Sequence, residues 1–575
     1  MKTAISKSVR FLAAMALVLW LAATAFAAVP GISGPTFNLT AQTAFLNQPD
    51  GEAVYSWGYG CDPAHAPAGF LPAAITGATC PTMQVPGPTL IVHEGDSVTV
   101  NLLNGLPNAV GNTSILFPGF TLTSTCAAPA VQGLLACEAA PGGSVTYTFT
   151  ASTPGTHAYY SGTQGDLQIE MGLYGAVVVL PATIPANCTT GYHAANLTAK
   201  AHWGEPDFRL SSAAYDHPGS CYDREYLFQW AEMDTRIHRQ ALAQVTALVG
   251  CAAGAAGCSL NVQTEPYHPA YFLINGRSMP DLMDPNYAGE YPHQPYNANP
   301  HTHPGELLLI RTIGQGRWQH PFHEHANHVR ILARDGNLQH SGSTTNVTYT
   351  SGLAGDAGAT GRGLAGLLMF NTDTTPGESF DGIFYFTGRG LNWDPYGHHP
   401  GDTADPLASL PCTADANGYN SGAPTALNFM EWCQDHNKPV QVNPFGDVAA
   451  GGPTTLPDPN VFTNGPWYGG SPYLGPDASL RGNAPACVGS PYGIPNPTTL
   501  SGAANMPPNG QPVNTANCTN LNPANLQLNP ANERGWAFMW HSHNEREITT
   551  NNVFPGGMLM MLLVDSREFV IDEKL

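Results

Sequence analysis

Residues 94–106 read EGDSVTVNLLNGL, and their apolar residues alternate with polar ones. Val98, Val100 and Leu102 therefore fall on one face of an extended chain, because successive side chains of a β-strand point to opposite sides. Turn-forming residues are abundant throughout, since the chain has 62 glycines and 51 prolines. This composition disfavours long helices and predicts an all-β protein.

The strand belongs to a series that the chain contains twice. In the first half it is followed by TSILFPG at 113–119, PGGSVTYTFT at 141–150, PGTHAYYSG at 154–162 and GLYGAVVVLP at 172–181. The second half repeats the order with PGELLLIRTIG at 304–314, HPFHEHANHVRILARDG at 320–336, PGESFDGIFYFT at 376–387, RGWAFMWHSHNE at 534–545 and PGGMLMMLLV at 555–564. We interpret the series as two copies of one β-sandwich. The alignment pairs Ser161 with Ser542, and the loop around Leu116 with the loop around His323.

The repeat divides the chain into segments. We expect a signal peptide at 1–27, a first sandwich at 28–185 and a second sandwich at 186–575. The second sandwich contains an insert at about 387–533 that is dense in Pro, Gly and Asn and is too long for an ordinary loop. The insert is interpreted either as an ordered cover over one end of the sandwich, stapled by disulfides, or as a degenerate third domain.

The amino-terminal segment is typical of an exported protein. Basic residues precede the apolar run FLAAMALVLWLAA, and the small residues around Ala27 form a cleavage site. All twelve cysteines follow that site, and an even number in an exported chain indicates disulfides. Spacing leaves the connectivity open, and the simplest scheme joins Cys61 with Cys80, Cys126 with Cys137, Cys188 with Cys221, Cys251 with Cys258, Cys412 with Cys433 and Cys487 with Cys518. We expect the protein in the periplasm or outside the cell.

The charge balance excludes one class of partner. Charged residues are only 11% of the chain, and the formal net charge is −21. Binding nucleic acid requires a basic face, so nucleic acid is not an expected partner. No stretch after the leader is long and apolar enough to predict a membrane span.

Two histidine motifs of the second copy predict a metal site. They are HPFHEHANH at 320–328 and WHSHNE at 540–545. Each has two histidines one residue apart, which places both imidazoles on one side of a strand end. If the repeat is correct, both motifs lie at the same end of one sandwich, and four histidines meet there: His323, His325, His541 and His543. Neutral imidazoles suit copper(II) or zinc, and the Irving–Williams order favours copper, as one or two ions. The alternative is a polar seam of hydrogen-bonded histidines without metal.

Several phrases resemble the multicopper oxidase family of the laccase and bilirubin oxidase type, which is built from cupredoxin (plastocyanin-like) domains. They are VPGPTLIVHEGDSVTV at 85–100, MGLYGAVVVL at 171–180, YFLINGRSMPD at 271–281, HPFHEH at 320–325, and HSH at 541–543 followed by GGM. The resemblance covers roughly 85–180 and 267–565 and leaves the insert unmatched. It implies tandem cupredoxin-like Greek-key β-sandwiches and a copper cofactor.

The first sandwich lacks the ligands that the resemblance implies. Where the family has TSI-His-Trp-His-Gly, this chain has Leu116 and Pro118 in place of the two histidines. Where the family has Tyr-His-Ser-His, it has Tyr160 and Gly162. Four-electron reduction of oxygen needs three coppers held together, so full laccase activity is not expected.

The blue-copper site of the second sandwich is also incomplete. His320 matches one of its histidines, but Ser542 replaces the cysteine and Glu547 replaces the last histidine. A serine hydroxyl cannot substitute for the thiolate that blue copper requires, so no rapid electron relay from a remote donor is expected. His320 is a candidate metal ligand, although a structural hydrogen bond is the favoured role for it. His328 and Glu547 are candidates for completing or orienting the ligand shell.

These observations leave three functional hypotheses. The first is a secreted copper-binding protein, related to multicopper oxidases, whose residual site acts directly on a small-molecule or metal-ion substrate. The second is a non-catalytic extracellular structural or interaction module that has lost metal binding. A zinc or mononuclear copper hydrolase is weaker, because no motif places a general base. Glu324, Asn544 and Glu545 are either proton donors or solvated flanking residues, and HTH at 301–303 is read as part of a Pro/Gly-rich loop where any metal binding is adventitious.

Overall fold

The computed structural model describes residues 28–386 except 127 and 128, 412–433 except 427, 466–467, 470–471, and 535–573 except 566, 568, 569 and 572. The expected signal peptide, most of the insert and the pair Cys487 and Cys518 lie outside the described residues. Most of the regular secondary structure in the described chain is β-strand, which confirms the all-β prediction.

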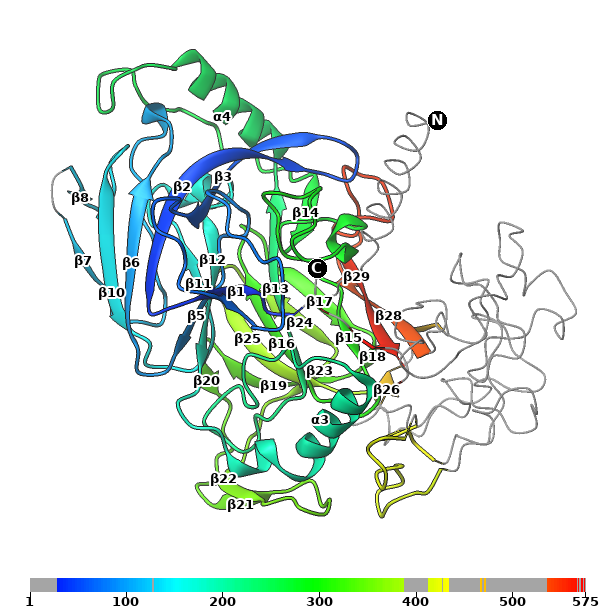
Figure 1. Ribbon diagram of the computed structural model, residues 1–575. Helices are drawn as coiled ribbons and strands as arrows, with labels where there is room; N and C mark the ends of the chain where they lie inside the picture. The colour runs from blue at the N-terminus through cyan, green and yellow to red at the C-terminus, as the bar shows by residue number, and fades with distance from the viewer. Residues whose placement is uncertain are drawn as a thin grey trace, which may run out of the picture.

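The first sandwich consists of two sheets, drawn in blue and cyan in Figure 1. One has the strand order β11 (Gly155–Tyr160), β12 (Tyr174–Leu180), β5 (Leu90–His93), β1 (Gly31–Ser33) and β4 (Phe70–Leu71). The other has the order β3 (Ala53–Cys61), β2 (Thr36–Asn47), β6 (Ser97–Asn104), β10 (Ser144–Thr150) and β7 (Thr123–Thr125). Val98, Val100 and Leu102 of β6 are completely buried between the sheets, as their alternation predicts.

The second sandwich, green to red in Figure 1, repeats this arrangement. The sheet that faces the first sandwich has the order β14 (Tyr271–Ile274), β13 (Arg224–Met233), β16 (Leu308–Gly314), β25 (Ser379–Phe384), β19 (Val329–Arg334) and β20 (Asn337–Leu338), with β23 (Leu368–Met369) beside β19. Its other sheet has the order β15 (His301–Thr302), β29 (Leu559–Asp565), β28 (Gly535–Ser542), β17 (His320–Glu324) and β24 (Asn371–Thr374), with β27 (Gly470–Ser471) beside β28. The core between them contains Phe322, Trp540 and Met560, each less than 1% exposed.

Strand pairing confirms the repeat residue by residue. In the first sandwich Leu116 bridges Tyr160, and the amide of Ser161 donates to the carbonyl of Leu173 at 3.0 Å. In the second, His323 is paired with His541, and the amide of Ser542 donates to the carbonyl of Met558 at 2.9 Å. Ser161 and Ser542 are therefore equivalent, as are Leu116 and His323. The expected boundary between residues 185 and 186 stays a prediction.

A buried polar seam joins the two sandwiches where β11 packs against β16 and β25. Asp381 accepts hydrogen bonds from the hydroxyls of Thr156, at 2.6 Å, and Tyr215, at 2.5 Å. Arg311 donates from Nε to Glu225 at 2.9 Å and lies near Asp381. A buried charge is tolerated only with such partners, so this seam fixes how the two sandwiches meet.

Two helices that the sequence analysis did not predict cover the sheets: α3 (Gly191–Trp203) and α4 (Thr235–Ala247). Ile237 and Ala241 of α4 are buried in the core of the first sandwich, across one end of which the helix lies (Figure 1). The other short elements are α2 (Gly165–Gln168), η1 (Asn108–Val110), η2 (Ala186–Thr189), η3 (Asp281–Met283), β8 (Val131–Gln132) with β9 (Cys137–Glu138), β18 (Ala326–Asn327) with β26 (Pro466–Trp467), and β21 (Asn346–Tyr349) with β22 (Ala359–Arg362). No helix among the described residues is both long and apolar enough to cross a membrane.

The disulfides follow the simplest pairing scheme wherever the structure describes the cysteines. They are Cys61–Cys80, Cys126–Cys137, Cys188–Cys221, Cys251–Cys258 and Cys412–Cys433. The last of these closes a loop in the described part of the insert, and the choice between a stapled cover and a degenerate third domain stays a prediction.

Candidate metal centre

Three of the predicted ligands meet at one end of the second sandwich. His323 on β17 and His541 on β28 are directly opposite each other on antiparallel strands. His325 follows two residues after His323, on the same side of the chain, and Ala326 then turns the backbone with a φ of 89°. The side-chain nitrogens of His323, His325 and His541 all lie within 4.8 Å of one another. The cluster therefore depends on the register of two strands that are far apart in sequence.

Hydrogen bonds to backbone carbonyls orient two of the rings. Nδ1 of His323 donates to the carbonyl of Phe370 at 2.6 Å, and Nδ1 of His541 donates to the carbonyl of Ser542 at 2.6 Å. A carbonyl only accepts, so Nδ1 carries the proton and Nε2 carries the lone pair in each neutral ring. Such a second hydrogen bond fixes the tautomer of most metal-binding histidines.

The nitrogen spacing fits a shared ion. Nε2 of His325 and Nε2 of His541 are 3.2 Å apart. Two imidazole nitrogens that each lie about 2.0 Å from one metal ion, at roughly tetrahedral angles, are separated by about 3.2 Å. Nitrogen donors of this kind suit copper or zinc, so the residues present fit a copper ion.

The surroundings keep the histidines in the neutral form that binds metal. Burial, together with the nearby rings of His325, His541 and His543, lowers the pKa of His323 to about 4. Burial also lowers the pKa of His541, although its hydrogen bond to Ser542 opposes the shift. Protons therefore compete weakly for these nitrogens at neutral pH.

His543 lies at the open side of the cluster. Its side chain is exposed, and its ring centroid is 4.9 Å from that of His323 and 5.7 Å from that of His541. It is outside the set of three histidines whose ligand atoms all lie within 4.8 Å. Phe370, which is 42% exposed, stands edge-on to His323 beside the same opening. The site is thus accessible from solvent.

Asn371 and Glu324 are parts of this site that the sequence analysis missed or misread. Asn371 is the cross-strand partner of His323, so both side chains are on the same face, and its buried Oδ1 has no hydrogen-bond partner among the described residues. Glu324 is completely buried, not solvated as one hypothesis held, and accepts from the hydroxyl of Thr372 at 2.9 Å. Burial raises the pKa of Glu324 well above its usual range, so this carboxyl retains its proton at neutral pH.

His320, the fifth predicted ligand, is held apart by two carboxylates. Its Nε2 is 2.9 Å from Oε2 of Glu232, and its Nδ1 is 2.9 Å from Oε2 of Glu547. Ser542, in the position of the family's cysteine, donates from Oγ to the same Glu547 oxygen at 2.5 Å, and Asn544 donates to the other at 2.8 Å. Burial opposes protonation of His320, but the two carboxylates raise its pKa to about 9. A protonated imidazole therefore bridges two buried acids here.

The remaining histidine candidates lie elsewhere. The ring of His328 stands edge-on to that of Phe370, with the centroids 5.4 Å apart, and His328 lines a separate cavity. The HTH segment is not a simple loop, because His301 and Thr302 form β15. His301 is hydrogen-bonded to Asp565 and His303 to Glu205, both at 2.7 Å and both buried. These two histidines form part of a buried ionic network.

Comparison with known proteins places the recognisable likeness in the first sandwich. A family model described as "Multicopper oxidase" matches residues 77–183. Laccase-3 of Botryotinia fuckeliana is 38% identical over 102 residues, which are 17% of this chain and 21% of that protein. L-ascorbate oxidase of Brassica rapa subsp. pekinensis is 36% identical over 96 residues, which are 17% of this chain and 16% of that protein. The chain thus spans about a fifth of the length of the curated relatives that it matches.

Comparison with solved structures also finds copper proteins, with low scores. The blue copper oxidase from Nitrosomonas europaea has 18% sequence identity and a TM-score of 0.36, over 62% of this chain and 77% of that one. A copper nitrite reductase from the same organism has 16% identity and a TM-score of 0.32, over 62% and 85%.

Proposed function

The chain belongs to the multicopper oxidase family, and from that premise we propose that it is an exported copper protein with one residual histidine site that oxidises its substrate directly. The proposed ligands are His323, His325 and His541, with His543 at the open side. The substrate class is a small molecule or a metal ion that reaches the site from solvent. Disulfides at every described cysteine support export, because they persist in oxidising compartments.

The observation that carries this proposal is the geometry of the three inner histidines. Two of the three rings are held by carbonyls that set the tautomer, and the Nε2 atoms of His325 and His541 are spaced as two ligands of one ion. Packing alone does not require three imidazoles to converge at a solvent-accessible end of a sandwich. The donor set fits copper, and bound copper supplies one-electron redox chemistry.

The protein groups around the site hold the histidine rings, carry a proton and determine where electrons would enter. The carbonyls of Phe370 and Ser542 hold the rings of His323 and His541, so little reorganisation is needed on binding. Glu324 holds a proton on its carboxyl directly beneath the cluster, on the opposite face of β17. Ser542 offers no thiolate, so electrons must enter at the cluster itself and not through an adjoining blue site.

A second candidate function is favoured by the bridge at His320. Glu232, His320 and Glu547 satisfy one another without a metal, so this part of the former copper machinery has become structural. The same could be true of the whole protein, which would then be an extracellular structural or interaction module. Whether the histidine cluster binds copper distinguishes these two functions.

Metal content after copper loading and desalting tests the proposal. We expect one or two retained copper ions per chain, no intense blue thiolate band, and a higher melting temperature that a chelator reverses. His323→Ala and His541→Ala should lose copper while keeping the fold. His65→Ala is the control, because that exposed histidine lies in the first sandwich. No retained copper, or equal copper in both cluster variants and the wild type, would reject the site and favour the structural module.

A further inference from the structure

A second binding site is suggested by a cavity of about 460 Å³ that segments between Asn187 and Met430 enclose. Its walls come from η2 and α3, the loop before β13, the β21–β22 hairpin and the stapled segment around Tyr419. This volume is in the range of small-molecule sites. None of the residues that line it belongs to the histidine cluster.

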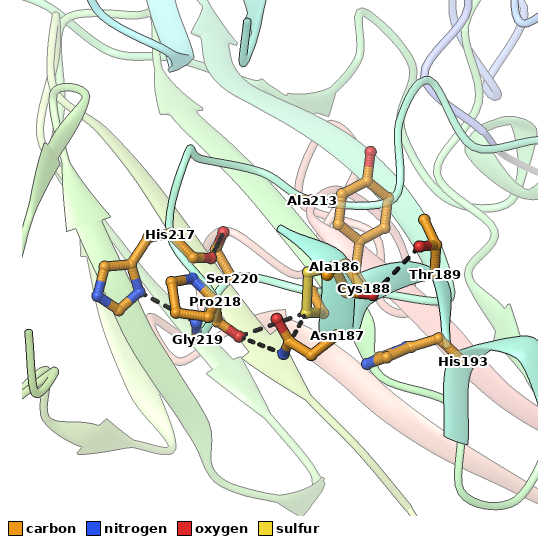
Figure 2. Close-up of a disulfide and its surroundings, with 12 residues drawn as sticks. Ala186, Asn187, Cys188, Thr189, His193, Ala213, His217, Pro218, Gly219 and Ser220 are labelled. Atoms are coloured by element: carbon orange, nitrogen blue, oxygen red, sulfur yellow. Dashed lines mark hydrogen bonds between the residues drawn. A yellow bond between two sulfur atoms is a disulfide. The ribbon is translucent and has the colours of Figure 1, made fainter. Parts of the chain in front are cut away.

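Two disulfides brace opposite walls of this cavity. Cys188–Cys221 ties η2 to the loop before β13, and Cys412–Cys433 closes the segment that carries Tyr419. Figure 2 shows Asn187 between the first disulfide and the Pro218 turn. Its amide nitrogen donates to the carbonyl of Pro218 at 2.9 Å and to the sulfur of Cys221 at 3.2 Å. The wall is therefore held in place before a ligand binds, which lowers the cost of ordering it.

The fixed amide leaves an acceptor unused. Asn187 is 7% exposed, and its Oδ1 is buried without a hydrogen-bond partner among the described residues. Burying such an oxygen without a partner costs roughly 1–3 kcal/mol. Because Asn187 lines the cavity, a ligand that carries a hydroxyl or N–H donor would satisfy it.

His193 supplies a second polar group. It lines the cavity, and its Nδ1 is hydrogen-bonded to buried Asp223 at 2.7 Å. Burial raises the pKa of Asp223, but His193, Arg209 and the backbone N–H of Leu307 together hold the pKa below its usual value, so the acid is ionised and only accepts. Nδ1 of His193 thus donates to Asp223, and Nε2 is the ring nitrogen that remains for a ligand.

The rest of the lining favours a neutral, ring-shaped ligand. Tyr192, Tyr349 and Tyr419 provide flat faces, and Asp415 makes the wall acidic. None of the described lining residues is Lys or Arg, so phosphates and carboxylates have no charged partner. Aromatic rings next to buried hydrogen-bond acceptors match the alternating C–H faces and hydroxyl edges of a sugar.

We propose that this cavity binds a neutral carbohydrate, with Asn187 accepting a hydrogen bond from one of its hydroxyls, His193 forming a hydrogen bond with another, and the tyrosine rings packing against its faces. The site is separate from the histidine cluster and requires no copper. A carbohydrate site would hold the exported protein, or its substrate, near a polysaccharide surface.

Calorimetric titration of the whole protein with cellobiose, glucose and glucuronate tests this proposal. The affinity for cellobiose or glucose should be the same before and after a chelator removes metal from the protein. Glucuronate should bind more weakly, because its carboxylate is repelled by that of Asp415. Tyr349→Leu and Asn187→Leu should each weaken binding about tenfold, the effect of losing one good contact. Thr348→Ala is the control, since this neighbour of Tyr349 is exposed and does not line the cavity.

Each other outcome overturns the proposal. No heat with either neutral sugar would reject a carbohydrate site. A sugar affinity unchanged in Tyr349→Leu would place any binding elsewhere. Tighter binding of spermidine than of cellobiose would assign the acidic, aromatic wall to a cation instead.

Discussion

Nδ1 of His320 lies 2.9 Å from Oε2 of Glu547, and this acid also receives the hydroxyl of Ser542. Ser542 and Glu547 therefore act together at the position where the family resemblance implies a blue copper. The serine offers no thiolate, and the glutamate is hydrogen-bonded both to this serine and to His320. The result is a locked polar group and not an empty metal site.

The contact between Glu547 and His320 predicts what happens when blue-copper ligands are introduced at this position. Ser542→Cys alone should give no intense blue band on copper loading, because Glu547 still holds His320. Ser542→Cys combined with Glu547→His restores the two histidines and the cysteine that blue copper needs, and should give the band. Absorption spectra of both variants check this. A blue band in the single variant would show that the Glu547 contact does not block the metal.

Glu232 should matter more for stability than its position suggests. It is buried, pairs with His320, and accepts backbone N–H bonds from Arg317 at 2.6 Å and Trp318 at 2.9 Å. Glu232→Gln removes one partner of a buried ion pair, and we expect a loss of about 3 kcal/mol in the free energy of unfolding. Glu265→Gln is the matched control, because this exposed acid pairs with Arg317 at the surface and should cost under about 1 kcal/mol. Urea denaturation would measure both, and equal losses would contradict the role of the bridge.

Stability should pass through a maximum near pH 6.5 in the metal-free protein. The pKa of His320 is raised from 6.5 to about 9, so the stability it contributes is complete below pH 6.5 and is lost as the pH rises through 9. The pKa of His323 is lowered from 6.5 to about 4, so its contribution is complete above pH 6.5 and is lost as the pH falls through 4.

Thermal unfolding across this pH range would show both limbs. His320→Gln should flatten the alkaline limb and leave the acid limb, whereas His323→Gln should do the reverse. If His320→Gln leaves the slope between pH 6.5 and 9 unchanged, the bridge is not the source of that limb.

Asn371 should tune the affinity for copper without being essential. Its side chain shares a face with His323, and its Oδ1 is an unused acceptor beside the cluster. Removing a group that orients metal ligands typically costs about 10–100-fold in affinity, so Asn371→Ala should weaken copper binding by that factor. Asp373→Asn, two residues along the same strand and exposed, is the control. A competition titration with a chelator would detect the difference, and equal affinities would exclude Asn371 from the site.

The sequence predicted features that depend on local spacing. The alternation of apolar and polar residues predicted β6, and the Pro-Gly turns helped to predict the repeat. The spacing of neighbouring cysteines predicted the described disulfides. His323 and His325 could be matched with His541 because the repeat brings β17 beside β28. These are short-range patterns, or patterns that a repeated fold converts into contacts.

Features that depend on register between distant strands were not predicted. Glu232 is 88 residues from His320 and lies in a strand whose ten residues are all buried, so nothing local marks it as a partner. Asn371 becomes relevant only because β24 pairs with β17 at that one offset. The burial of Glu324 was misread because a charged residue between two ligands suggests a solvated edge.

The bridge at His320 has a consequence for the order of events in maturation. A site that needs a metal to neutralise its donors stays open until the metal arrives. Here protonated His320 is hydrogen-bonded to one acid of β13 and to one in the loop after β28, so these distant segments can close on each other without copper. The second sandwich can thereby fold before any copper is supplied. Copper would then bind to a chain that is already folded.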